Sequence, residues 1–245
     1  MNVILSTTIL SFVLFLGDLI DQEAEMIKKI DRVYHTTRSN SDLYELVKFI
    51  NESLKIFPES DRIFWRLGRT YFKLGQKSNS KADKIHYYLS CMEQTKKALN
   101  KNTKSANGYF FNGLCNGSLG EVQGIWSSLG KIAPFKKDME TAISLDPTVN
   151  QGGPHRALAN LYLKLPYILG GDVAKAIIYF REAVRLGPHF GENYLGLAKA
   201  YIQNEDIDLA INTLQTFLEI IPDLQKEESL NQWHVEALNL IKKIK

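Results

Sequence analysis

The sequence has little of what marks catalytic or metal-binding proteins. Its two cysteines, Cys91 and Cys115, form no Cys-x-x-Cys pair, which excludes the common zinc-ribbon and dithiol redox motifs. The five histidines show no His-x-x-x-His spacing and no neighbouring carboxylate cluster, so we expect no metal site. A Gly-x-Ser-x-Gly nucleophile elbow is also missing. These absences predict a protein that is not an enzyme and needs no cofactor.

Charge is nearly balanced, with a formal net charge of +3. This excess is too small to imply a nucleic-acid partner, and no basic-aromatic RNA motif accompanies it. Local charge is less even, because eight lysines between Lys73 and Lys104 face only Asp83 and Glu93. A solvated helical face explains this pattern, and an acidic partner or an anionic membrane surface is the alternative.

The two cysteines fall on segments predicted to be helical. A small buried thiol is the usual role of such a residue. An export compartment would permit a disulfide between Cys91 and Cys115, so the sequence leaves their pairing open.

The N-terminal segment is apolar. Residues 1–17 contain no charged side chain, a length that suits the hydrophobic part of a secretory signal and is short for a membrane span. No Lys or Arg follows Met1, and no Ala-x-Ala site precedes Asp18. We predict a signal sequence or an apolar anchor over residues 1–17 and a periplasmic or exported protein. The alternative is an apolar first helix packed on the rest of the chain.

Four prolines mark the expected ends of helix pairs in the remaining sequence. They are Pro58, Pro147, Pro188 and Pro222, and an apolar residue lies one or two positions before each of them. The last two are 34 residues apart, which is the period of a tetratricopeptide (TPR) unit. We therefore predict an all-α, TPR-like superhelical array of antiparallel helix pairs. It would form one domain over residues 18–245, with about four to five pairs.

Two C-terminal units follow the TPR pattern best. One spans about Gly191 to Pro222, where Phe217 replaces the small residue that is usual at its position. The other spans about Gly152 to Pro188, and its turn is lengthened, with Asp172 placed to cap the following helix. A final amphipathic segment, Lys226–Lys245, predicts a capping helix that packs through Leu230, Trp233, Ala237, Leu238 and Ile241.

Earlier units are expected to be longer. We predict a long polar turn from Gly75 to Lys84 and a glycine-bearing insertion from Gly117 to Gly130 between paired helices. Residues 22–57 should form a diverged first pair, ended by Pro58.

The repeat register projects certain first-helix side chains onto the inner concave surface. These candidate ligand or partner contacts are Arg62, Trp65, Arg69, Phe72, Asn107, Phe110, Leu114, Arg156, Asn160, Leu163, Lys199 and Ile202. Arginine can clamp a carboxylate and aromatic rings supply apolar walls, so an organic acid or an acidic peptide terminus would fit. Alternatively, Trp65 and Phe110 simply fill the packing between repeats.

The segment from Asn107 onward resembles the TPR family of the T component of TRAP transporters. The motifs that carry the resemblance include Gly152-Gly153-Pro154-His155-Arg156 and Gly170-Gly171-Asp172-Val173-Ala174. The resemblance implies a periplasmic helical protein that associates with a solute-binding subunit and holds an organic-acid or apolar ligand. This chain lacks the lipobox cysteine that family members often have.

Two functions are compatible with these patterns. One is a non-enzymatic exported scaffold that binds a periplasmic solute-binding protein. The other is a general TPR adaptor that grips a peptide or another protein in its concave groove. The oligomeric state, including a homo-oligomer, stays open.

Overall fold

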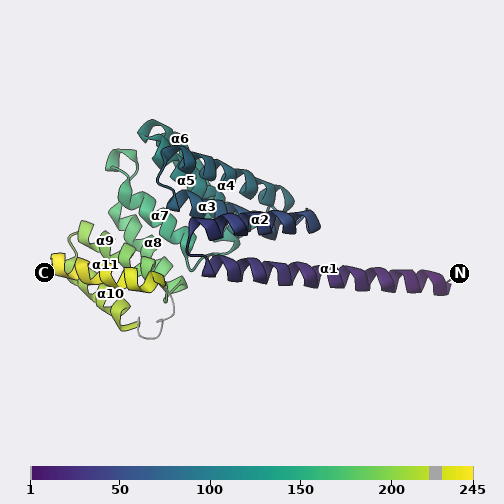
Figure 1. Ribbon diagram of the computed structural model, residues 1–245. Coiled ribbons are helices and arrows are strands. Elements are labelled where there is room, and N and C mark those ends of the chain that lie inside the picture. Colours follow the sequence, from purple (N-terminus) through teal and green to yellow (C-terminus); the bar gives the residue numbers. More distant parts are fainter. Residues whose placement is uncertain (1, 221–227, 245) are drawn as a thin grey trace. The chain divides into compact units, whose positions relative to one another are not determined.

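The computed structural model describes residues 2–220 and 228–244 (Figure 1). Every regular element in these two ranges is a helix. The elements are α1 (Asn2–Thr36), α2 (Asn40–Ile56), α3 (Asp61–Lys77), α4 (Lys81–Lys101), α5 (Ala106–Gln123), α6 (Ile125–Leu145), α7 (Gly153–Lys164), the short 3-10 helix η1 (Tyr167–Leu169), α8 (Val173–Leu186), α9 (Gly191–Gln203), α10 (Ile207–Ile220) and α11 (Glu228–Ile244). The all-α prediction is confirmed.

The helices belong to two compact units, Met1–Lys131 and Ile132–Lys245, which we call unit 1 and unit 2. Helix α6 begins in unit 1 and ends in unit 2. The predicted limits, a segment 1–17 followed by one domain 18–245, stay a prediction.

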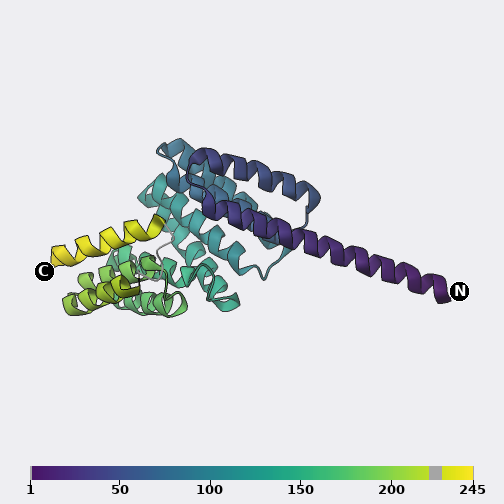
Figure 2. The ribbon, with the colours of Figure 1, turned by 60° about the horizontal axis from the view of Figure 1, so that its bottom comes forward.

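Helix α1 is continuous from the apolar N-terminal segment into the folded part of unit 1. Its N-terminal half runs past the helices that pack on its C-terminal half, as both ribbon views show (Figures 1 and 2). Within the described part of the chain, no helix combines the length and apolar character needed to cross a membrane.

Serine side chains cap the N-termini of three helices of unit 1, α2, α3 and α4. The Ser39 side chain accepts a hydrogen bond from the Asp42 N–H, and the Asp42 carboxylate accepts one from the Ser39 N–H at 2.8 Å. This reciprocal capping box satisfies backbone donors that would otherwise lack partners. Ser60 and Ser80 cap α3 and α4 through their side-chain oxygens.

The first three helices share one apolar core. Its buried members are Ile27, Ile30, Leu46, Ile50, Phe57, Ile63 and Leu67. The members that lie on one helix are three or four residues apart, so each helix turns one stripe inward, and Phe57 follows the end of α2. Helices α1 and α2 thus agree with the predicted first pair.

The prediction of a long polar turn from Gly75 to Lys84 is wrong. Helix α3 continues to Lys77, and α4 begins at Lys81. Gly75 is buried inside α3, where a Cβ atom would lie 2.5 Å from Cε1 of Tyr88. The glycine therefore admits the Tyr88 ring of α4 and does not make a turn.

The predicted insertion from Gly117 to Gly130 is also wrong. Helix α5 continues to Gln123, and α6 begins at Ile125. Only Gly124 separates them, with φ at 105°, in the left-handed region that glycine adopts without strain.

Unit 2 contains the two helix pairs that the sequence predicts, α7 with α8 and α9 with α10. The Asp172 side chain caps α8 by accepting from the Lys175 N–H at 3.0 Å, as expected. Phe217 is fully buried, and it fits because Gly191 opposite has no side chain: a Cβ there would lie 2.6 Å from the Phe217 Cζ.

Helix α11 packs on α9 and α10 as the predicted capping helix. Trp233 and Ala237 are buried, and the Trp233 ring lies 5.0 Å from that of Phe190. Leu238, however, is 47% exposed, so it is not part of the packed face. The predicted contact of Leu230 falls outside the residues whose side chains are described.

Candidate interaction site

One face of α3 presents a row of cations, which we call the basic stripe. Its members are Arg62, Arg66, Arg69, Lys73 and Lys77. They are three or four residues apart, so they share one side of the helix. The charge of Lys77 also reaches Asp42, whose carboxylate is already engaged in capping α2.

Asp31 of α1 pairs with two members of the stripe. Arg66 donates from Nε and Nη2 to the two carboxylate oxygens at 2.9 and 2.7 Å, and Arg69 donates from Nη2 at 2.7 Å. Burial alone would raise the pKa of Asp31, but the hydrogen bonds and charges of Arg66 and then Arg69 hold it below its ordinary value. One carboxylate therefore neutralises only one of the two guanidinium charges.

Arg69 is held between two aromatic rings. Its guanidinium carbon lies 3.8 Å from the Tyr34 ring centre and 5.2 Å from that of Trp65. Such contacts favour a desolvated cation. The Arg69 Nε is buried and has no hydrogen-bond partner, so one donor of this group is unused.

Lys73 stands next in the row and faces other cations. Its Nζ donates to the Thr37 Oγ1 at 3.2 Å. Burial lowers the pKa of Lys73, and the charges of Lys77, Arg69 and Arg38 lower it further. An anion placed here would relieve this repulsion, because an opposite charge stabilises the protonated amine.

Aromatic rings border the stripe. Trp65 stacks on Phe111 of α5 with ring centres 5.9 Å apart, and Phe72 lies 5.9 Å from Tyr88 and 6.4 Å from Phe111. Trp65 is only 7% exposed. These rings join α3 to its neighbours, which is the packing role that the sequence left open for Trp65.

The other predicted contact residues of unit 1 differ in their exposure to solvent. Arg62 is exposed, and Asn107 and Leu114 are partly exposed on α5. Phe110 is 1% exposed and packs edge to face on Phe111, so it lies in the core. Binding of a ligand by these residues stays a prediction.

In unit 2 the predicted contacts are mostly engaged within the fold. Arg156 is buried on α7, and Asn160 donates to its carbonyl oxygen at 3.0 Å. Lys199 pairs with Glu236 of α11 at 2.6 Å. The remaining two, Leu163 and Ile202, are partly exposed.

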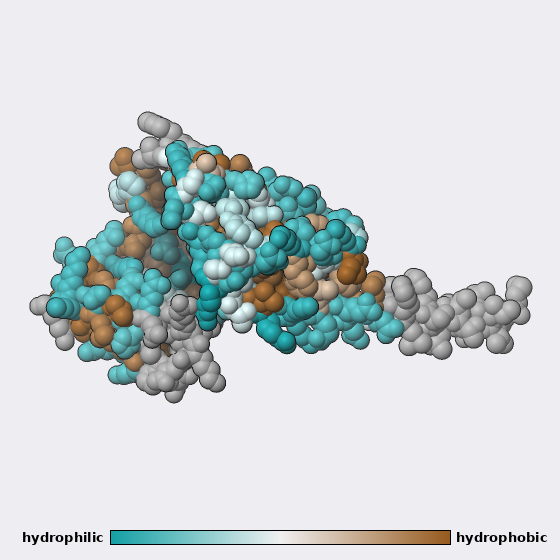
Figure 3. All heavy atoms as spheres, in the orientation of Figure 1, coloured by the Kyte–Doolittle hydropathy of each residue, from teal (hydrophilic) through white to brown (hydrophobic). Residues whose placement is uncertain are grey.

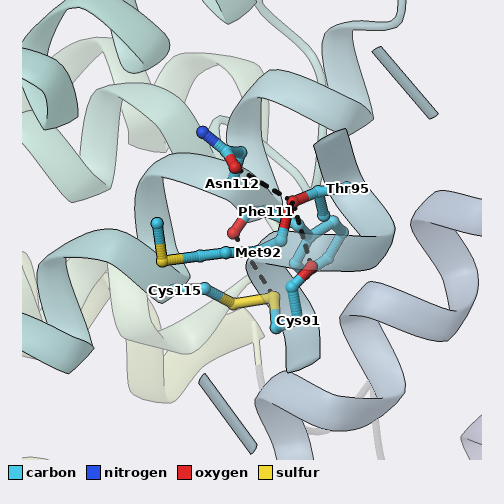
Figure 4. The surroundings of a disulfide bond; sticks show 6 residues. All are labelled: Cys91, Met92, Thr95, Phe111, Asn112 and Cys115. Atoms are coloured by element: carbon cyan, nitrogen blue, oxygen red, sulfur yellow. Dashed lines mark hydrogen bonds between the residues drawn. A yellow bond between two sulfur atoms is a disulfide. The ribbon is translucent and has the colours of Figure 1, made fainter. Parts of the chain in front are cut away.

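A disulfide joins α4 to α5, between Cys91 and Cys115 (Figure 4). Both residues are fully buried. Nearby, Thr95 donates to the Asn112 side-chain oxygen at 3.1 Å, which adds a polar link between the same two helices. The sequence left the pairing of the two cysteines open, and the structure shows both of them buried with their sulfurs bonded.

Sequence reasoning missed Asp31, Arg66 and Lys73. The spacing from Arg62 to Lys77 is a signal that could have revealed the cation row. Asp31 could not be found this way, because it comes from α1 and meets α3 only in the folded unit.

The described residues contain no group of three His, Cys, Asp or Glu side chains able to hold a metal ion. The arrangement in unit 1 is instead suited to binding an anionic group beside aromatic rings.

Known proteins give this arrangement a context. Residues 26–151, slightly more than half of the chain, match the family described as "Regulator of microtubule dynamics protein 1-3". The chain belongs to this family. A second match, to a tetratricopeptide repeat family, covers residues 167–227. The TPR prediction is confirmed, whereas the specific resemblance to the TRAP T component stays a prediction.

A member of the regulator of microtubule dynamics family from Bos taurus, "Regulator of microtubule dynamics protein 1", is 26% identical over 147 residues. The match covers 54% of this chain and 46% of that protein. The chain therefore spans about half the length of the curated relative that it matches.

Solved structures show the same fold. A TPR protein from Thermus thermophilus is 18% identical, with a TM-score of 0.67 over 88% of this chain and 98% of that one. The protein MamA is 22% identical, with a TM-score of 0.50 over 76% of this chain and 92% of that one. TPR folds generally act as scaffolds for protein interaction and not as enzymes.

Proposed function

We propose that this protein is a non-enzymatic adaptor that binds an acidic segment of a partner protein along the basic stripe of unit 1. The observation that carries the proposal is the pairing of one carboxylate, Asp31, with two arginines in a row of five cations. An acidic segment would supply the missing negative charge.

The chemistry of the stripe favours carboxylates. Arginine binds carboxylate oxygens through paired donors, and the exposed Arg62 can supply such a pair. Arg69 and Lys73 add positive charge along the same face of α3. A row of cations also speeds the approach of an acidic partner, because its field extends beyond direct contact.

The family indicates where the partner could be sought. The cattle relative is named a regulator of microtubule dynamics. For this chain we therefore propose a partner among microtubule components or microtubule-associated proteins that expose acidic segments. The charge of the stripe and the family membership support this choice.

The test is binding of a fluorescent glutamate-rich peptide, followed by anisotropy, with a glutamine-rich peptide as the neutral control. Charge reversal at Arg62 and Lys73 (R62E and K73E together) leaves the Asp31 ion pairs in place. We expect binding to weaken by at least about tenfold and to depend on salt. The matched control is K96E on α4, an exposed lysine outside the stripe. Equal affinity of all variants, or equal binding of the neutral peptide, would overturn the proposal.

A second candidate function is that of an exported scaffold that binds a solute-binding subunit and an organic acid. The Cys91–Cys115 disulfide favours it, since disulfides persist mainly in oxidising compartments. The test is to lyse the native cells in a denaturant that contains an alkylating reagent, so that buried thiols also react, and then measure which cysteines were blocked. Alkylated cysteines would contradict an exported location, whereas unmodified cysteines, together with a solute-binding protein that co-purifies under native conditions, would support it.

A further inference from the structure

The turn between α7 and α8 exposes two apolar side chains to an unusual degree. Tyr167 is 90% exposed and Ile168 is 87% exposed. The other exposed large apolar side chains of the described residues range from 38% to 62%. At the place of this turn in Figure 1, Figure 3 shows hydrophobic, brown atoms at the surface.

This exposure does not come from a loose loop. Tyr167 and Ile168 lie in η1, and the N–H groups of Leu169 and Gly171 both donate to the Pro166 carbonyl oxygen, at 2.9 and 3.0 Å. The end of the turn is tied to α7, because the Asp172 N–H donates to the carbonyl oxygen of Tyr162 at 3.0 Å. Hydrogen bonds therefore fix the backbone that carries these two exposed side chains.

Two glycines make this conformation possible. Gly170 has φ at 89°, in the left-handed region. A Cβ atom on Gly171 would lie 1.8 Å from the Leu165 carbonyl oxygen. No other residue fits these positions without strain, so the chain is built to hold the turn in this shape.

Lysines surround the base of the turn. Lys136 and Lys175 lie 5.0 and 5.7 Å from the ring of Tyr162, and Lys164 ends α7. Lys164 is the one charged residue between positions 157 and 171. Asp172, which pairs with Lys175, is the acid at the start of α8. The charge of Glu140 also acts on Tyr179, whose ring stacks on that of Tyr162, so three lysines and two acids lie near the base of the turn.

The size of the tip decides what can cover it. A stable protein interface buries roughly 800 Å² on each partner, far more than two side chains provide. A tyrosine beside an aliphatic residue and lysines is, in contrast, typical of the boundary between water and lipid. Lysines near the surface are attracted to anionic lipid headgroups.

We propose that the α7–α8 turn is a membrane-contact tip, in which Tyr167 and Ile168 insert into the headgroup region of an anionic bilayer. Lys136, Lys164 and Lys175 then face the lipid phosphates. The tip lies in unit 2 and is independent of the basic stripe, which lies in unit 1. It would hold the adaptor at a membrane while unit 1 binds its partner.

The test uses the full chain and vesicles of phosphatidylcholine with or without about 30% phosphatidylserine, which supplies the negative surface charge. Tyr167→Ser together with Ile168→Ser removes the apolar tip. The matched control is Ile178→Ser together with Val235→Ser, which changes two exposed apolar residues of unit 2 outside the turn. Circular dichroism and thermal unfolding check that all variants fold.

We expect the tip variant to bind anionic vesicles at least about tenfold more weakly than the wild type, and the control variant to bind normally. Residues 1–17 are apolar and present in every variant, so a second readout reports on the tip alone. An NBD fluorophore on Ile168→Cys should brighten when anionic vesicles are added. Unchanged fluorescence, equal binding of the tip variant, or no binding by the wild type would each overturn the proposal.

Discussion

Arg156 of α7 donates from Nη1 to the side-chain oxygen of Asn193 on α9, 2.8 Å away. The Asn193 amide nitrogen lies 2.7 to 3.0 Å from the carbonyl oxygens of Gln151, Ala183 and Gly187. Burial lowers the pKa of Arg156, and the charge of Glu192 opposes that effect. An arginine that the sequence presents as a carboxylate clamp thus connects two helix pairs.

Replacing Asn193 by Ala should destabilise unit 2 by about 3 kcal/mol, because it removes the hydrogen bond from Arg156 and those from the Asn193 amide to three carbonyl oxygens. Urea unfolding followed by circular dichroism measures the change. Asn212→Ala on the exposed face of α10 is the matched control and should stay within about 0.5 kcal/mol of the wild type. Equal stability of the two variants would show that the network contributes nothing.

Removing the disulfide by Cys91→Ala with Cys115→Ala should lower the free energy of unfolding by about 3 kcal/mol, since the bond closes a loop of 24 residues. The unfolded wild-type protein should give no reaction with a thiol reagent until a reductant is added, because no free cysteine exists. Two reactive thiols before reduction would contradict the bond.

Replacing Gly196 by Ala should destabilise unit 2 by about 2 kcal/mol, because the new methyl group overpacks the core. Its Cβ atom would lie 2.1 Å from Cε1 of Phe180, which is fully buried. Gly130→Ala is the control: it meets no atom within 4 Å, and in a helix it should stabilise by about 0.5–1 kcal/mol. Thermal unfolding of the two variants should therefore shift in opposite directions.

Lowering the pH should destabilise unit 1, because the Asp31 carboxylate becomes protonated. Its pKa is depressed in the folded state by Arg66 and Arg69, against the effect of burial. A group of this kind stabilises the fold above its unfolded pKa, near 3.9, and loses that contribution as pH falls through the lower folded value.

Asp31→Asn should therefore lower the free energy of unfolding by about 2 kcal/mol at neutral pH, and by less below about pH 3. The expected loss is this small because solvent screens the Asp31 side chain, which is 29% exposed. Urea midpoints at several pH values give the profile, with Asp208→Asn on an exposed turn of α10 as the control. If the Asp31 variant and the wild type kept the same stability difference at every pH, the ion pair would have no role.

Much of the helical arrangement follows from local signals. The period between Pro188 and Pro222 predicts the α9–α10 pair, and Asp172 marks the start of α8. Predictions of turns from glycine are wrong where the glycine instead makes room for a side chain of a neighbouring helix. Gly75 suggests a turn in the sequence, but in the fold it makes room for Tyr88, a residue on the next helix.

The candidate site was less predictable. Helical spacing places Arg62 and Arg69 on one face of α3, but it gives no indication that Asp31, 38 residues before Arg69, meets them. Helical spacing also suggests that Arg156 is available to bind a ligand or partner. It gives no sign of Asn193, which lies 37 residues further along the chain and binds Arg156 in the folded unit.

The sequence by itself determined the helices, their pairing and the repeat family, because capping residues, apolar periodicity and prolines act over a few neighbouring residues. Only the tertiary structure decided which cations are neutralised and which apolar side chains stay outside. Arg156 is enclosed, the basic stripe keeps excess charge, and Tyr167 and Ile168 project outward. These outcomes depend on contacts between residues far apart in the chain, where charge and burial are set by whichever helix packs opposite.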